Sequence, residues 1–338
     1  MCGICAISRN PVKSSIPDAR KFMRLGAIAI ESRGGHATGF AWADPTGLPW
    51  YWKTQGPATK VAKFAPLETG MQVVIGHTRH ATQGRVEDNV NNHPIIGEGL
   101  ALVHNGRVEN DSTLFDLMPD YERTGEVDSE AILAILASTE HFGASHPVEV
   151  LEMVKGVAAI SWIDVETPGA LHLARLSTRP LTVGYTRRND LVMSSTPETM
   201  RAWSLMAKVE IQNIRPIAEG TYLMVVDGKI EDQRKFKVRS PQRFVPDDRP
   251  GGLIRHTLPT GKWSGHPAQK RTPNQNQKVR ALSVVSRMTD AEIREAQPDP
   301  YSPEWYDDQA FIDPVDDDLM FDEVMDYETW VARQGWSK

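Results

Sequence analysis

The sequence has few features of several common protein classes, and each scarcity excludes one of them. Only two of its 338 residues are cysteines, Cys2 and Cys5, which cannot staple a chain of this length and favour a reducing compartment. No run approaches the roughly 18 apolar residues of a membrane span, and the first residues lack the basic start of a secretory signal. A net charge of −6 argues against a dedicated nucleic-acid binder. We therefore expect a cytoplasmic protein with no membrane association.

The charge is concentrated toward the end of the sequence. Residues 239–280 hold nine lysines and arginines against two acidic residues, a net charge of +7, with six prolines and only eight apolar residues. Because this segment cannot bury enough surface to offset its ordering entropy, we expect a basic, Pro-rich, mostly disordered linker. A docking surface for an acidic partner or a phosphate backbone is the alternative, so nucleic-acid binding stays open for this linker.

Residues 281–338 form the second charged part and are expected to be an acidic tail with short helices. Residues 301–338 hold eleven acidic residues against two basic ones, a net charge of −9. Apolar side chains at helical spacing from about 316 to 332 predict one face of an amphipathic helix. That face would either fold back on the body of the protein or dock into the groove of a partner.

The body, residues 2–238, alternates between the two kinds of hydrophobic pattern. Spacing of apolar residues predicts helices at 16–31, 131–136, 147–154 and 197–203. Short apolar runs predict strands at 73–75, 100–103, 157–163, 170–176, 181–185, 191–194, 222–226 and 229–238. Asp227-Gly228 separates the last two strands and is a strong hairpin signal. Many strands with few helices of crossover length predict antiparallel sheets in an α+β body.

Four polar clusters carry the candidate chemistry. Cys2 follows the initiator Met1, and its small side chain predicts that processing removes Met1 and leaves a thiol beside its own α-amine. Both groups titrate near neutrality, at about 8.5 and 7.7–8.0, so they form a self-contained nucleophile and base. The other three clusters lie near the ends of predicted strands: Gly76 to Gly84, His104-Asn105-Gly106 and Asp128-Ser129-Glu130.

Together these clusters resemble the class II glutamine amidotransferases, which are N-terminal-nucleophile hydrolases, and most closely the glutaminase domain of glucosamine-6-phosphate synthase. The matching segments are Met1-Cys2-Gly3-Ile4, Gly76-His77-Thr78-Arg79-His80-Ala81-Thr82-Gln83-Gly84, Asn91-Asn92-His93-Pro94, Val103-His104-Asn105-Gly106-Arg107-Val108-Glu109-Asn110 and Asp128-Ser129-Glu130. Their order and spacing agree with the family over about residues 2–238. The resemblance implies a four-layer αββα sandwich with two antiparallel sheets.

The resemblance also implies a role for each motif residue. Cys2 would attack the side-chain amide of glutamine, and the amide nitrogen of Asn105 with the backbone N–H of Gly106 would stabilise the oxyanion. Arg79 would pair with the substrate carboxylate, with Thr82 and Gln83 beside it in the substrate-binding set, and Asp128 would bind the substrate ammonium. No cofactor or metal is implied. Glycine at position 106 would let the backbone approach closely.

The sequence departs from the family pattern at a few positions. Residues 33–39 read Arg-Gly-Gly-His-Ala-Thr-Gly where the family has Arg-Gly-x-Asp-Ser-Ala-Gly, so His36 replaces an acid and Thr38 a small residue. Gln83 stands where some members have His, and His80 where they have Trp or Tyr. These changes put the local hydrogen bonding near the nucleophile in doubt, and His80 is open to a role on the acceptor side.

Structural interpretations stand beside the catalytic ones. Cys2 and Cys5 are spaced as half of a zinc or redox site, but the histidines that would complete it already have places in the motifs. Cys5 is therefore expected to be a small buried residue, while His77, His93 and His104 are expected to be structural core histidines. The alternative for Arg79 is a simple salt bridge, and Asp128 looks like the N-cap of a helix as well as an ammonium ligand.

Three functions compete at this point. The first is a glutaminase that supplies ammonia to an acceptor-modifying synthase on a separate chain, because nothing after residue 238 resembles a synthase domain. The second is a stand-alone γ-glutamyl amide hydrolase of the same fold, which Cys2-Gly3-Ile4 disfavours. The third is a non-catalytic glutamine-binding scaffold, against which the intact Cys2 and Asn105 argue. The acceptor is not indicated by any residue.

Overall fold

The computed structural model describes residues 1–43 and 49–239. The expected basic linker from residue 240 onward and the expected acidic tail at 281–338 lie outside the described residues.

The described chain contains six α-helices and thirteen strands. The helices are α1 (Ala19–Ile30), α2 (Ala58–Val61), α3 (Asp111–Asp116), α4 (Ser129–Ala137), α5 (Pro147–Leu151) and α6 (Pro197–Ala207). The strands are β1 (Gly3–Ser8), β2 (Ala37–Ala43), β3 (Pro49–Gln55), β4 (Val73–Arg79), β5 (Ile95–Gly97), β6 (Leu100–Val108), β7 (Gly156–Asp164), β8 (Ala170–Ser177), β9 (Thr182–Thr186), β10 (Leu191–Ser194), β11 (Ile211–Pro216), β12 (Thr221–Val226) and β13 (Lys229–Lys235). Short 3₁₀ turns are η1 (Glu31–Arg33), η2 (Ala62–Phe64) and η3 (Asn89–Asn91).

The strands form two antiparallel sheets packed face to face. One sheet has the order β11-β9-β10-β1-β4-β2-β3 and the other β13-β12-β8-β7-β6-β5. Apolar side chains from both sheets, among them Ile4 and Ile75 from the first and Val103 and Leu173 from the second, share one fully buried cluster. This cluster is the central layer of the core, because each sheet contributes its inward-facing alternate residues to it.

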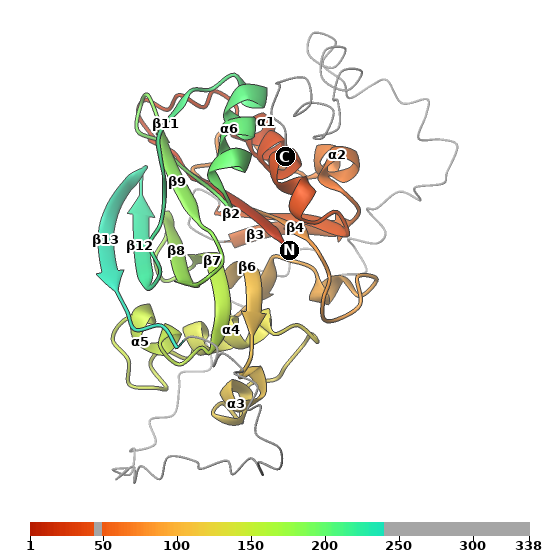
Figure 1. Cartoon of the computed structure of the whole chain (residues 1–338), viewed down its shortest axis with the longest axis vertical. Helices are drawn as coiled ribbons and strands as arrows, with labels where there is room; N and C mark the ends of the chain where they lie inside the picture. Colours follow the sequence, from red (N-terminus) through yellow and green to blue (C-terminus); the bar gives the residue numbers. More distant parts are fainter. Residues whose placement is uncertain (44–48, 240–338) are drawn as a thin grey trace, which may run out of the picture. The chain divides into compact units, whose positions relative to one another are not determined.

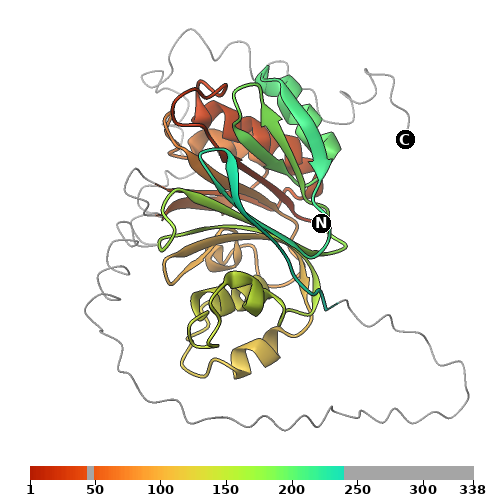
Figure 2. The ribbon, with the colours of Figure 1, turned by 90° about the vertical axis from the view of Figure 1, so that its left-hand side faces the viewer.

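Helices cover the outer face of each sheet (Figure 1, Figure 2). α1 and α6 lie on the first sheet, where the Trp203 and Phe22 rings pack with centroids 4.6 Å apart and Trp203 Nε1 donates to the Phe22 carbonyl at 2.8 Å. α3, α4 and α5 lie on the second sheet over a separate apolar cluster that includes Ile132 and Trp162. The layers therefore run helix, sheet, sheet, helix, which confirms the expected αββα sandwich.

Local signals explain where several elements begin. The Asp18 side chain caps α1 by accepting from Lys21 N at 3.1 Å. Asp227 and Gly228 both have positive φ, as a two-residue hairpin turn requires, and they join β12 to β13 as expected. The expected cap at Asp128 is different in detail. Asp128 occupies the N-cap position of α4, but its side chain makes no capping hydrogen bond to the helix.

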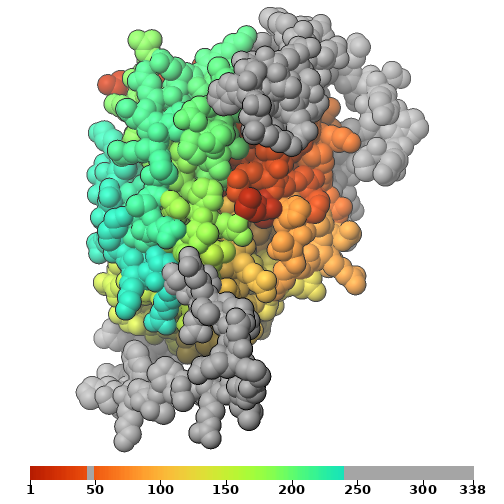
Figure 3. Space-filling model, viewed as in Figure 1, coloured from red at the N-terminus to blue at the C-terminus, as the bar shows by residue number. Residues whose placement is uncertain are grey.

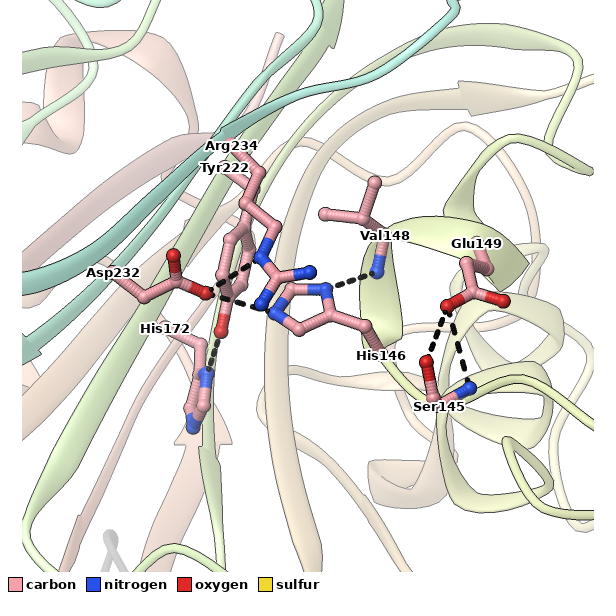
Figure 4. Close-up of polar contacts among 8 residues, drawn as sticks. All are labelled: Ser145, His146, Val148, Glu149, His172, Tyr222, Asp232 and Arg234. Carbon is pink, nitrogen blue, oxygen red and sulfur yellow. Dashed lines mark hydrogen bonds and ion pairs between the residues drawn. The ribbon is translucent and has the colours of Figure 1, made fainter.

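The edge strand β13 is attached to α5 by polar contacts (Figure 4). His146 Nε2 lies 3.0 Å from Asp232 Oδ2, while its Nδ1 accepts from Val148 N at 3.1 Å and so caps α5. The His146 ring meets the Tyr222 ring edge-on, and the Tyr222 hydroxyl lies 2.9 Å from His172 Nδ1. These contacts are structural, since they join an outer helix to the sheet edge.

The fold contains elements that the hydrophobic pattern does not predict. They are β2, β3, β5, β11, α2 and α3, whereas the expected strands at 73–75 and 100–103 extend to Arg79 and Val108. The extensions matter for function. They carry β4 and β6 directly into the polar motifs. Arg79, Asn105 and Gly106, which were expected near the ends of strands, are therefore strand residues.

Candidate active site

The N-terminal end of β1 brings Cys2 to the motif at the end of β4. β1 lies between β10 and β4 near the middle of its sheet, and Gly3 pairs with Thr78 in an antiparallel register. Cys2 therefore lies beside the Arg79–His80 segment, where β4 ends. Figure 1 and Figure 2 both place the N-terminus at the level of the two sheets, and in the space-filling view the N-terminal segment reaches the surface (Figure 3).

The thiol of Cys2 is half-buried and held by backbone groups. His80 N donates to Cys2 Sγ at 3.3 Å, and Sγ lies 3.6 Å from the His80 carbonyl oxygen. Burial raises the pKa of Cys2, while the His80 N–H, the N-terminal amine and Arg79 oppose that rise. A thiol that is protonated near neutrality needs a base before it can act as a nucleophile. In the structure Met1 still precedes Cys2, so the α-amine that would serve as base is set free only by removing Met1.

The amide of Asn105 is a buried donor without an acceptor. Asn105 is 1% exposed on β6, and among the described residues its Nδ2 has no hydrogen-bond partner. Leaving a buried donor unpaired costs about 1–3 kcal/mol, so such groups mark sites where a ligand supplies the partner. Beside it, a Cβ on Gly106 would stand 1.9 Å from the Val157 carbonyl oxygen. The packing of β6 against β7 therefore requires glycine at position 106, and the close approach of its backbone to a substrate stays a prediction.

Three histidines and a serine hold this part of β6 in place. His77 Nε2 lies 3.0 Å from the carbonyl oxygen of His104, which joins β4 to β6 across the two sheets. Ser129 Oγ lies 2.9 Å from His93 Nε2 and 2.8 Å from His104 Nδ1, and the His77 and His93 rings stack at 4.2 Å. Burial lowers the pKa of His77 to about 3 and also lowers the pKa values of His93 and His104. The expectation that they are structural core histidines is confirmed, because they are buried, hydrogen-bonded and neutral.

The guanidinium of Arg79 organises the loop that follows β4. Its Nη1 donates to Asn92 Oδ1 at 2.7 Å and to the Arg85 carbonyl at 3.3 Å, and its Nη2 donates to the carbonyls of Gln83 and Gly84 at 2.5 and 3.0 Å. All four acceptors are neutral, so within the described chain these hydrogen bonds pair the positive charge of Arg79 with no carboxylate. Pairing with a substrate carboxylate stays a prediction.

The remaining members of the expected substrate-binding set surround the same region. Thr82 and Gln83 are exposed, and Gln83 Nε2 donates to the Glu126 carbonyl at 2.6 Å, which ties its loop to the segment before α4. Asp128 is half-buried and accepts from Val108 N through Oδ2 at 2.6 Å. Its charge is close enough to Cys2 to raise the pKa of the thiol. The structure thus gathers Cys2, Arg79 and Asp128 around one site, and their contacts with glutamine stay predictions.

Two supporting residues were not expected from the sequence. Arg33 Nε donates to the Cys2 carbonyl at 3.1 Å, and this arginine was already visible as the first residue of the 33–39 motif. Lys53 is 8% exposed and its Nζ donates to the carbonyls of Asn92 and Pro94 at 2.9 and 3.0 Å. It therefore supports the segment whose Asn92 binds Arg79. A lysine in an edge strand gives no sequence signal for such a role.

The described residues lack two other kinds of functional feature. Within residues 1–43 and 49–239, no three or more His, Cys, Asp or Glu side chains cluster in a way that could hold a metal ion. In the same ranges, no helix has the length and apolar character needed to cross a membrane. Cys5 is fully buried in β1, which confirms it as a small core residue.

The four-layer sandwich, with a cysteine just before a central strand and a backbone N–H that donates to its sulfur, has the fold of the N-terminal-nucleophile hydrolases. Comparison with solved structures agrees. The glutamine phosphoribosylpyrophosphate amidotransferase of B. subtilis, complexed with ADP and GMP, matches with a TM-score of 0.56 over 70% of this chain and 49% of that chain, at 21% sequence identity. A structure described as the allosteric regulatory enzyme of purine biosynthesis matches with a TM-score of 0.55.

Comparison of sequences identifies the family. A model of the glutamine amidotransferase domain matches residues 77–202. Glutamine–fructose-6-phosphate aminotransferase of Agrobacterium fabrum is 34% identical over 194 residues, 55% of this chain and 30% of that protein. The same enzyme of Bacillus thuringiensis is 30% identical over 202 residues, 57% of this chain and 32% of that protein. The chain carries a class II glutamine amidotransferase domain. It spans about a third of the length of these curated relatives.

Proposed function

We propose that this domain hydrolyses glutamine to glutamate through a thioester on Cys2 and supplies the ammonia to a synthase. The observation that carries the proposal is the unpaired Asn105 amide nitrogen, which is buried next to Gly106 on the strand that His77 joins to β4. A buried donor of this kind supports a site for an oxyanion, because the tetrahedral intermediate of acyl transfer supplies the missing acceptor.

The steps follow from the groups at the site. The Cys2 sulfur adds to the side-chain amide carbon of glutamine, and the Cys2 α-amine, which removal of Met1 sets free, takes the thiol proton. The oxyanion forms hydrogen bonds with Asn105 Nδ2 and Gly106 N. The amine then returns the proton to the leaving nitrogen, and ammonia departs as the thioester forms. Water adds to the thioester carbon, the carbon–sulfur bond breaks, and glutamate leaves with the thiol restored.

The raised pKa of Cys2 supports the use of a base in the first step. The thiol is protonated near neutrality because burial disfavours the thiolate. Deprotonation is therefore coupled to attack, with the α-amine as acceptor. Arg79 and Asp128, whose charges both act on Cys2, suit the carboxylate and the ammonium of a free amino acid. Opposite charges at the two ends favour glutamine over a peptide-bound side chain.

The mechanism is tested by replacing each of the two cysteines. Ammonia release from L-glutamine is measured for the wild type, Cys2→Ala and Cys5→Ala, with the N-terminal mass determined for each to establish removal of Met1. We expect Cys2→Ala to lose activity while keeping its circular dichroism spectrum, because alanine leaves Met1 removable but supplies no nucleophile. Cys5→Ala removes the buried thiol that lies in the core of β1 and should stay active. Ammonia release by Cys2→Ala at the wild-type rate would overturn the mechanism.

The finer part of the proposal is that the synthase is a separate chain. The composition of residues 239–338, with a basic Pro-rich stretch of net charge +7 and an acidic stretch of net charge −9, suits a docking segment. The test is co-purification of the native protein with its partner, repeated with a chain that ends at Val238. We expect truncation to abolish the association and to leave ammonia release from glutamine intact. Partner binding that survives truncation would contradict the docking role.

A further inference from the structure

The segment before β2 is bonded directly to the segment that holds the nucleophile. His36 N donates to the Arg79 carbonyl at 3.0 Å, and the His36 carbonyl accepts from Gly56 N at 2.9 Å. The backbone at position 36 is therefore fixed between the end of β4 on one side and the end of β3 on the other.

The side chain of His36 makes two further contacts with the same segment, one with Ala81 and one with the His80 ring. His36 Nδ1 accepts a hydrogen bond from Ala81 N at 3.0 Å, and its ring stacks on the His80 ring with centroids 5.0 Å apart and an interplanar angle of 22°. His80 N is the group that donates to Cys2 Sγ at 3.3 Å. The donor to the nucleophile is thus held between two hydrogen bonds to the same residue, one from the His36 backbone and one to the His36 ring.

The bond to Ala81 specifies the protonation state of the imidazole. Its donor is a backbone N–H, so Nδ1 must carry a lone pair, and the single ring proton is on Nε2. An imidazolium carries a proton on both nitrogens, so protonation of His36 would set two N–H groups against each other and break the bond.

We propose that His36 is the positioning residue of the nucleophile: through its backbone N–H and its imidazole Nδ1 it fixes the 79–81 backbone so that the His80 N–H points at Cys2 Sγ. The proposal concerns the site whose glutaminase activity is proposed above and rests on that function only for its effect on turnover. Its effect on the thiol itself is independent, because the His80 N–H favours the thiolate of Cys2 whatever the substrate.

Charged and titratable groups surround the two stacked rings. Arg33 lies on the same segment as His36, Arg79 and His80 lie across from it, and Cys2 with the N-terminal amine lies beyond His80. The amine and His36 together lower the pKa of His80, so the His80 ring is neutral near pH 7 and adds no charge to the pair there. Of the two stacked rings, that of His36 accepts the hydrogen bond from Ala81 N.

The experiment uses alkylation of Cys2 as a direct measure of its thiolate. The chain has only one other cysteine, Cys5, which is fully buried, so iodoacetamide labelling of the N-terminal peptide followed by mass spectrometry reports on Cys2. Two variants of the full-length protein separate the hydrogen bond from the ring. His36→Asp keeps an acceptor for Ala81 N without a ring, and His36→Phe keeps a ring to stack on His80 without an acceptor. His141→Ala, which removes an exposed imidazole on another part of the chain, is the matched control.

At pH 7.5 we expect His36→Phe to be alkylated about threefold or more slowly than the wild type, and His36→Asp and His141→Ala to stay within twofold. Threefold corresponds to a rise of about half a unit in the pKa of the thiol, since each unit changes the thiolate fraction tenfold.

Two results would overturn the proposal: equal alkylation of His36→Phe and wild type at pH 7.5, or alkylation of His36→Asp that is slowed as much as that of His36→Phe. Thermal melting of each variant identifies a general loss of structure, and if His36→Phe melts early, the rate of His36→Asp relative to His141→Ala decides. The glutaminase function fails separately, by absence of ammonia release from a wild-type protein whose Cys2 still shows the expected alkylation profile.

Discussion

At the scale of single residues, Asn105 has a buried polar group that the described chain leaves without a hydrogen-bond partner. A buried amide nitrogen without an acceptor costs about 1–3 kcal/mol, and this one lies at a strand position where an apolar residue would have no such cost. We predict that Asn105→Ala lowers the rate of ammonia release by about 10²–10³, the usual loss for one oxyanion donor. Because alanine removes the unpaired group, the melting temperature should stay level or rise.

Steady-state kinetics and a thermal melt on the same preparation check both parts of this expectation. The loss should fall on kcat rather than KM, since the oxyanion exists only after attack has begun. A variant that keeps the wild-type kcat would remove Asn105 from the mechanism. A melting temperature many degrees lower would mean that the amide nitrogen has an acceptor in the free protein.

The sequence indicates the identity of the site residues better than their contacts. Cys2, Asn105 and Gly106 are recognised because short motifs fix their backbone setting, and in the structure β7 leaves no room for a Cβ at Gly106. The contacts of Arg79 with three carbonyl oxygens and Asn92 could not be predicted in this way. They depend on the path of the loop after β4 and on its packing against residues 91–94, which no local pattern encodes.

At the scale of elements, the contact between α1 and α6 depends on a small residue. A Cβ on Gly26 would stand 2.6 Å from two ring carbons of Trp203, whose indole is fully buried and bonded to the Phe22 carbonyl. We predict that Gly26→Ala destabilises the protein by about 1–3 kcal/mol, the usual cost of overpacking a core, even though alanine is the better helix former.

Urea unfolding of Gly26→Ala is best compared with that of Gly70→Ala. Gly70 has no atom within 4 Å of an added Cβ among the described residues and no positive φ, so alanine there should change stability little or raise it slightly. Equal midpoints for the two variants would show that the indole moves aside without cost, against the tight packing inferred for this helix pair.

Elements with a strong local signal were predicted and elements fixed by their neighbours were not. The hairpin of β12 and β13 follows from Asp227-Gly228, and α1 from its apolar spacing and the Asp18 cap. β11 has Asn213 at positive φ and a register shift against β9, so it shows no clean alternation. β3 contains the buried Lys53, whose place in the sheet is fixed by carbonyls at 92 and 94 rather than by hydrophobicity.

At the scale of the whole domain, the joined sheets bury histidines that must stay neutral. His77, His93 and His104 lie between or beside the sheets, and His172 lies on β8 between the Tyr222 hydroxyl and Thr167 Oγ1. Burial is the main cause that lowers each of their pKa values, to about 3 for His77 and His172. These histidines therefore make the free energy of unfolding sensitive to acid, independently of the chemistry at Cys2.

The sign of that sensitivity follows from proton binding. An unfolded histidine titrates near pH 6.5, so below that pH the unfolded chain binds more protons than the folded one, and the free energy of unfolding falls as the pH falls. Each such histidine contributes up to about 1.4 kcal/mol per pH unit until its folded pKa is reached. Stability should be complete above about pH 7 and decline steadily from pH 6.5 toward pH 5.

His172 allows this prediction to be tested at one site away from Cys2. His172→Gln keeps a polar side chain between the Tyr222 hydroxyl and Thr167 Oγ1 but cannot take up a proton. Urea unfolding at pH 7.5, 6.5 and 5.5 should show the variant less stable than the wild type at the highest pH. That deficit should shrink by about 1 kcal/mol between pH 6.5 and 5.5, because only the wild type then loses stability through residue 172. A deficit that stays constant over this range would mean that His172 takes up its proton in the folded protein as readily as in the unfolded chain, and that burial on the helix-covered face of β8 does not hold it neutral.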